Sequence, residues 1–116
     1  MGNPISVLNR LRIEINNKQY YSDDTLTMYL DENGLDSTVN YDKSKMQKQL
    51  LQTVYDVLQS LSNNIDLFRS VETEFATTGQ AYNYLRKRMD DIEARILALP
   101  NSEGTKENMI NFMFNS

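Results

Sequence analysis

The chain has no cysteine, histidine or tryptophan among its 116 residues. This excludes disulfide scaffolds, thiol catalysis and Cys/His zinc sites, and it leaves no imidazole for proton transfer near neutral pH. The four glycines are scattered singly, so no glycine-rich phosphate-binding loop can be placed. Without His or Cys, no nucleophile–base pair for covalent catalysis can be assigned either. The sequence therefore predicts a protein that is not an enzyme and takes no cofactor.

Long apolar runs and a surplus of basic residues are also missing. No segment approaches the roughly 18–20 apolar residues that span a bilayer, and the N-terminus has no basic region followed by an apolar run. We therefore expect no membrane partner. The 12 basic and 16 acidic residues give a net charge of −4, whereas a free-standing nucleic-acid binder normally carries a basic surplus. The length suits one domain, which we place at residues 1–100 and follow with a tail at 101–116.

Apolar residues at helical spacing predict an all-α fold, a small bundle of about four helices. The first helix is expected to be capped by Asn3, to open at Pro4 and to end at the Asn16-Asn17 pair. Its apolar stripe comprises Ile5, Leu8, Leu11 and Ile15. A second, short helix should begin after Ser22, a strong N-cap, and Gly34 should stop it in the left-handed conformation.

The third and last helices are expected to be long. The third begins near Asp42 and stops at the cluster of residues 62–64. Its apolar face comprises Met46, Leu50, Val54, Val57, Leu58 and Leu61, and Leu51 and Tyr55 widen that face. The last helix is capped at residues 77–79 and ends before Pro100. Its stripe has the most regular period in the chain and comprises Ala81, Leu85, Met89, Ile92, Ile96 and Leu99.

Residues 65–75, between the two long helices, lack a clean apolar period. The stretch contains Val, Thr and Phe, which favour strands, so we expect a short extended segment or a hairpin. Such a segment can bind a partner by adding a strand to a sheet edge. Its expected partner-binding residues are Phe68, Val71 and Phe75.

The tail is a second candidate for partner binding. It opens with a polar turn and then carries an apolar cluster of Met109, Ile110, Phe112, Met113 and Phe114. Exposed Phe and Met clusters are costly unless something covers them. Two interpretations stay open: the cluster folds back and completes the core of its own domain, or it docks on a neighbouring chain.

Charged groups along the chain favour solvated helix surfaces over chemistry. The turn at residues 31–34 has part of a calcium-loop pattern, but Tyr29 and Asn40 stand where essential acidic ligands belong. We therefore predict no metal site. Arg86, Lys87 and Arg88 follow two tyrosines and form a short basic stretch. A solvated helix face is one interpretation of it, and a surface facing DNA or an acidic partner is the other.

The order of these motifs resembles the small head–tail connector, or adaptor, proteins of tailed bacteriophages. The resemblance covers about residues 5–100 and rests on short motifs. A short helix introduced by Tyr21-Ser22-Asp23-Asp24 stops at Gly34-Leu35, and a loop with Tyr41 precedes the long helix. Phe68-Arg69-Ser70-Val71 then leads through Thr77-Thr78-Gly79 into a helix that carries Leu85-Arg86 and ends Leu97-Ala98-Leu99-Pro100.

The resemblance implies a structural protein of the virion neck, made in the cytoplasm of the bacterial host. Connectors of this type form a ring, commonly of about twelve copies, between the portal protein and the next neck or tail protein. DNA passes through the ring without sequence-specific binding. Two alternatives come from the residues alone: a small helical protein–protein interaction module, such as a toxin–antitoxin-type partner, and a helical DNA-binding regulator.

Overall fold

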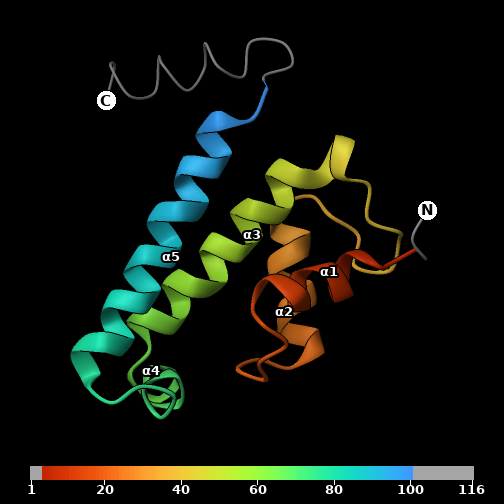
Figure 1. Ribbon diagram of the computed structural model, residues 1–116. Coiled ribbons are helices and arrows are strands. Elements are labelled where there is room, and N and C mark those ends of the chain that lie inside the picture. The colour runs from red at the N-terminus through yellow and green to blue at the C-terminus, as the bar shows by residue number, and fades with distance from the viewer. Residues whose placement is uncertain (1–3, 101–116) are drawn as a thin grey trace.

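The computed structural model describes residues 4–100 and contains five α-helices (Figure 1). Their bounds are α1 Val7–Glu14, α2 Asp23–Glu32, α3 Lys43–Asn63, α4 Ile65–Glu72 and α5 Thr78–Ala98. Helix α3 contacts each of the other four helices, and the antiparallel pair α3 and α5 forms the most extensive of these contacts (Figure 1). The all-α prediction is confirmed, with one helix more than expected.

Helix α1 begins three residues later than predicted, so the expectation of a start at Pro4 is wrong. Ser6 is the N-cap, and its side chain accepts a hydrogen bond from the Asn9 backbone N–H. The residues before it are extended because they pair with the loop that leads to α3. Ser6 forms an isolated antiparallel bridge with Asn40, and the Tyr41 N–H donates to the Ile5 carbonyl at 2.7 Å. In the other direction, the first-turn N–H groups of Val7 and Leu8, which have no partner within the helix, donate to the loop carbonyls of Val39 and Ser37 at 2.9 and 3.1 Å.

Most of the other predicted helix ends are found where the sequence placed them. Ser22, Asp42 and Thr77 are N-caps whose side chains accept backbone N–H hydrogen bonds. Gly34 has φ 78°, the left-handed conformation expected of a C-terminal glycine. Asn16 and Asn17, at φ 60° and 57°, reverse the chain after α1. Asparagine tolerates this region better than most residues do.

The expectation of an extended segment or hairpin at residues 65–75 is wrong, because α4 occupies Ile65–Glu72. Asn64 is the cause. It ends α3 and also caps α4, where its side-chain oxygen accepts from the N–H groups of Asp66 and Leu67 at 3.1 and 3.2 Å. Leu67 and Val71 then lie four residues apart and pack on the core. Tertiary packing of this apolar face outweighs the strand preference of the segment.

The hydrophobic core lies along α3, which packs against the other four helices. Buried α3 residues are Leu50, Leu51, Thr53, Val54, Val57, Leu58 and Leu61. This breadth agrees with the predicted widened face. On α5, Ala81, Leu85 and Ile92 are buried, while Met89 and Ile96 are half-buried against the same core.

Candidate interaction surfaces

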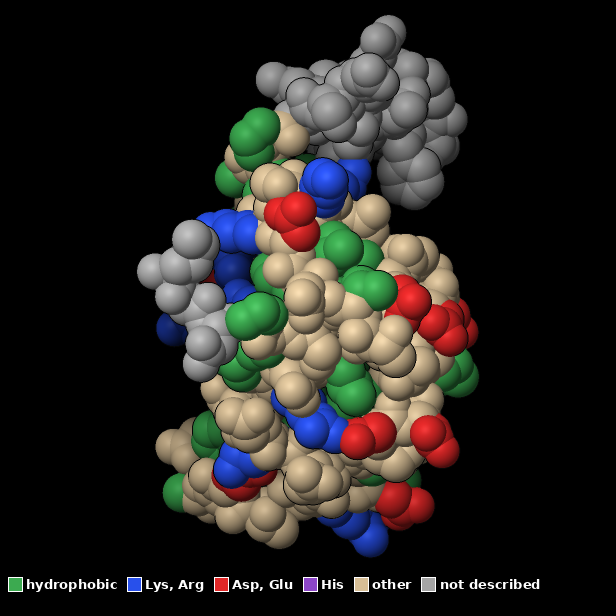
Figure 2. Space-filling view, turned by 90° about the vertical axis from the view of Figure 1, so that its right-hand side faces the viewer, with side chains coloured by type: hydrophobic (Ala, Val, Ile, Leu, Met, Phe, Trp, Pro, Cys, Tyr) green, Lys and Arg blue, Asp and Glu red, His purple; other side chains and the backbone are tan. Residues whose placement is uncertain are grey.

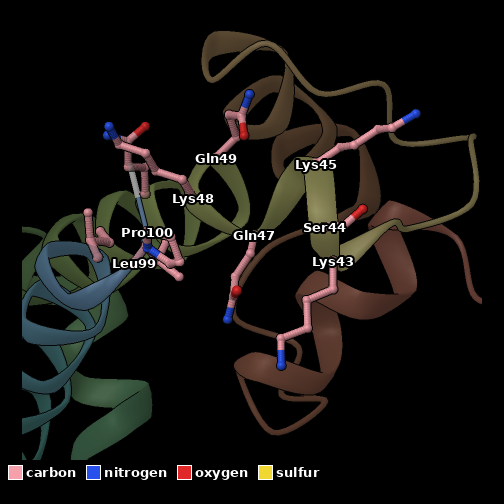
Figure 3. Close-up of a pocket in the computed structure, with 10 residues that line it drawn as sticks. Lys43, Ser44, Lys45, Gln47, Lys48, Gln49, Leu99 and Pro100 are labelled. Atoms are coloured by element: carbon pink, nitrogen blue, oxygen red, sulfur yellow. The ribbon is translucent and has the colours of Figure 1, made fainter. Parts of the chain in front are cut away.

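A hollow lies where the first turns of α3 face the end of α5 (Figure 3). It has a volume of about 970 Å³. One wall is apolar and comes from Ile96, Leu99 and Pro100; the other is polar and carries Lys43, Lys45 and Lys48 together with glutamines. We call this cavity, defined by these six residues, the α3/α5 hollow. One of its walls is apolar and the other is positively charged.

The local sequence explains why the lysines remain at the surface. The α3 helix begins at Lys43, and its buried residues begin only at Leu50. Before that point Met46 is half-buried against the core, while Lys43 and Lys45 are exposed. In Figure 3, Lys43, Lys45 and Lys48 leave α3 in different directions. No carboxylate of residues 4–100 lies within ion-pair distance of these three ammonium groups. Within the described part of the chain their charge is thus unpaired.

The exposed side of α2 has the opposite character. Asp24, Met28, Asp31 and Glu32 are exposed and follow the spacing i, i+4, i+7 and i+8, which places them on one face of the helix. We call these four residues the acidic α2 face. Met28 is 45% exposed, and among residues 4–100 none of the three acids forms an ion pair. Figure 2 shows acidic side chains gathered along one edge of this side of the molecule, with hydrophobic side chains beside them.

A third charged group is structural and largely enclosed. The Glu14 carboxylate, whose side chain is only 12% exposed, lies 2.8 Å from Arg10, 3.7 Å from Arg88 and 3.6 Å from Arg95. Burial alone would raise the pKa of Glu14. The hydrogen bond from Arg10 and the charges of the three arginines outweigh burial and lower that pKa below its ordinary value. The guanidinium of Arg10 also lies over the Tyr41 ring at 5.5 Å.

Only part of the predicted basic stretch at residues 86–88 remains exposed, because Arg88 belongs to the ion-pair group around Glu14. Arg86 and Lys87 are exposed on α5, whereas Arg88 is half-buried and directed at Glu14. Two of the three residues thus remain available to DNA or an acidic partner. The sequence analysis assigned the charged groups to solvated helix surfaces and missed the role of Glu14. Glu14 and Arg88 are 74 residues apart in the chain, so no sequence spacing could have indicated their contact.

The residues expected on the segment before α5 are mostly part of the domain's own packing. Val71 is buried, and Phe68 and Phe75 are half-buried against the core. The Phe75 ring packs against the Tyr84 ring of α5 in a tilted arrangement, with ring centroids 5.1 Å apart. Because the segment is helical, strand addition has no backbone basis here. The tail residues Met109, Ile110, Phe112, Met113 and Phe114 lie outside the described residues.

Residues 4–100 contain neither a metal-binding cluster nor a membrane-spanning helix. No group of three or more Asp or Glu side chains in this part of the chain is arranged to hold a metal ion. None of the described helices is long and apolar enough to cross a membrane. Comparisons with protein-family models, with curated proteins and with solved structures find no match for the chain.

Proposed function

We propose that this protein is a structural, non-catalytic subunit of a tailed-phage neck, which assembles into a ring between the portal protein and the next neck or tail protein. In this role it resides in the virion after synthesis in the bacterial host cytoplasm, and DNA passes through the ring without being read. The observation that carries the proposal is the order of the elements. A short helix capped by Ser22 and stopped at Gly34 precedes the long α3 helix, and a long last helix follows.

The surfaces of the domain support an assembling role. A closed ring of one kind of subunit uses two different faces on each copy, joined head to tail. The acidic α2 face and the α3/α5 hollow are two such unlike surfaces on one chain. A net charge of −4 suits a channel wall, since a negative surface does not retain DNA by counterion release.

The experiment is to measure the mass of the purified full-length chain by light scattering over a range of concentrations, with negative-stain images of the largest species. Ring-shaped particles of about twelve copies are expected. A chain that stays monomeric or dimeric at every concentration would contradict the proposal.

The second candidate is a DNA-binding regulator, and the exposed pair Arg86 and Lys87 favours it. A regulator of this kind would retard short duplex DNA in a salt-dependent manner, and Arg86→Ala and Lys87→Ala would weaken that binding. A neck subunit would give no such retardation. The two measurements together separate the candidates.

A further inference from the structure

The α3/α5 hollow and the acidic α2 face complement each other in both charge and polarity. The hollow has three lysines on one wall and three apolar residues on the other. The α2 face offers three carboxylates around the exposed Met28. A contact between them would cover Met28 with apolar side chains and pair each sign of charge with the other, which is the arrangement that favours a specific interface.

Within one copy these surfaces are associated with opposite ends of α3. The end of α2 is attached to the later part of α3, where Asn33 donates a hydrogen bond to Asp56 at 3.0 Å. The hollow is formed by residues 43–52 of α3 and by the end of α5. No ion pair joins the two surfaces among the described residues, so their complementarity is left for an intermolecular contact.

We infer that the acidic α2 face of one copy docks into the α3/α5 hollow of the next copy. The contact is head to tail, because the two faces differ, and it repeats from copy to copy until a ring closes. This inference rests on the proposed function and specifies which surfaces of the neck subunit would meet.

The arrangement of the lysines favours a helix over a small anion. Lys43, Lys45 and Lys48 diverge around the hollow and do not converge on one point (Figure 3). A single phosphate would contact one of them at a time. The carboxylates of Asp24 and Glu32 are spread over eight residues, or about 12 Å of helix, and can meet separated lysines.

The test uses charge reversal on the full-length chain. Lys48→Glu places an acid in the hollow, and Asp31→Lys places a base on the α2 face. Each variant alone brings like charges together at every contact, so the protein concentration needed for assembly should rise about tenfold or more. An equimolar mixture of the two should assemble at the wild-type concentration, since each reversed surface then meets an opposite charge on the other variant.

The matched controls are Arg69→Glu on α4 and Asp91→Lys on α5, two exposed residues outside both surfaces. They make the same changes in net charge and should leave assembly unchanged. Circular dichroism and melting temperature of all four variants should match the wild type, because none of these side chains is buried.

The outcomes distinguish the inference from the proposed function. If the wild type forms rings and Lys48→Glu and Asp31→Lys assemble as the wild type does, the inferred interface is wrong, whereas the proposed ring-forming function is retained. If the wild type never assembles, both fail. If Lys48→Glu instead abolishes retardation of duplex DNA without changing assembly, the hollow belongs to nucleic acid. If the effect of Lys48→Glu disappears when residues 101–116 are deleted, the hollow holds the chain's own tail. Either of these last two results overturns the inference.

Discussion

The Arg88 guanidinium donates a hydrogen bond to the backbone carbonyl oxygen of Glu14 at 2.7 Å, across 74 residues of chain. The same guanidinium lies 3.7 Å from the Glu14 carboxylate. Arg88 therefore holds the end of α1 against α5, two helices that contact each other less than each contacts α3. Because the Glu14 side chain is nearly enclosed, this link is protected from the screening that weakens surface ion pairs.

Neutralising Glu14 should destabilise the domain. In Glu14→Gln the three arginines lose their shared carboxylate, and the free energy of unfolding should fall by about 1–3 kcal/mol. Urea denaturation followed by circular dichroism measures this. Glu93→Gln is the matched control on α5, where the exposed side chain makes no ion pair among the described residues, and its effect should stay within about 0.5 kcal/mol. Equal effects of the two variants would show that the arginine group contributes nothing specific.

The same group predicts a loss of stability in acid. The pKa of Glu14 in the folded protein lies below its ordinary value of 4.5, so its stabilising contribution is present above that pH. The contribution is lost as the pH falls from 4.5 through the lower folded-state value, because the unfolded chain binds the proton first. Denaturation curves at decreasing pH should show the wild type converging toward Glu14→Gln. A difference between them that stayed constant with pH would argue against this assignment.

The packing between the two long helices should be sensitive to truncation. Leu58 on α3 is 4% exposed and Ile92 on α5 is fully buried, and replacing either by alanine should cost about 2–5 kcal/mol. Leu97→Ala is the control, since that side chain is 55% exposed and should cost less than about 0.5 kcal/mol. Unchanged melting temperatures for the first two variants would contradict the α3–α5 core.

Two glycines should respond in opposite directions to the same substitution. Gly34 has φ 78°, a region in which a Cβ atom is strained, so Gly34→Ala should destabilise the domain by about 1 kcal/mol. Gly79 lies in the first turn of α5, where an added Cβ would meet nothing closer than the Thr77 hydroxyl at 3.9 Å. Gly79→Ala should be neutral or stabilising by up to about 1 kcal/mol. Thermal unfolding of the pair tests this, and a Gly34→Ala variant as stable as the wild type would contradict it.

Deleting residues 101–116 should leave the domain folded. The buried apolar side chains of the described part of the chain all lie between Val7 and Ile92 and form one cluster. The truncated chain is therefore expected to keep a near-normal melting temperature. We predict that it attaches less well to the portal or to a neighbouring subunit, because Phe112 and Phe114 are the proposed anchors. Unfolding of the truncated chain would instead assign the tail to the core.

The features that depend on neighbours along the chain could be predicted from the sequence. The cap at Ser22 and the stop at Gly34 follow from local hydrogen bonding and from the backbone freedom of single residues. The broad apolar face of α3 and the stripe of α5 follow from a period of three and four residues, and both helices are found. These signals need no knowledge of the fold.

The conformation of residues 65–72 and the role of Glu14 depend on contacts between distant parts of the chain. Asn64 and the pair Leu67 and Val71 could have indicated a helix, but the strand preference of the same residues obscured that signal until packing on the core selected α4. Glu14 meets Arg88 only because α1 and α5 both pack on α3. The energy of such contacts depends on distances in space between residues that are far apart in the chain, and neither spacing nor composition encodes those distances.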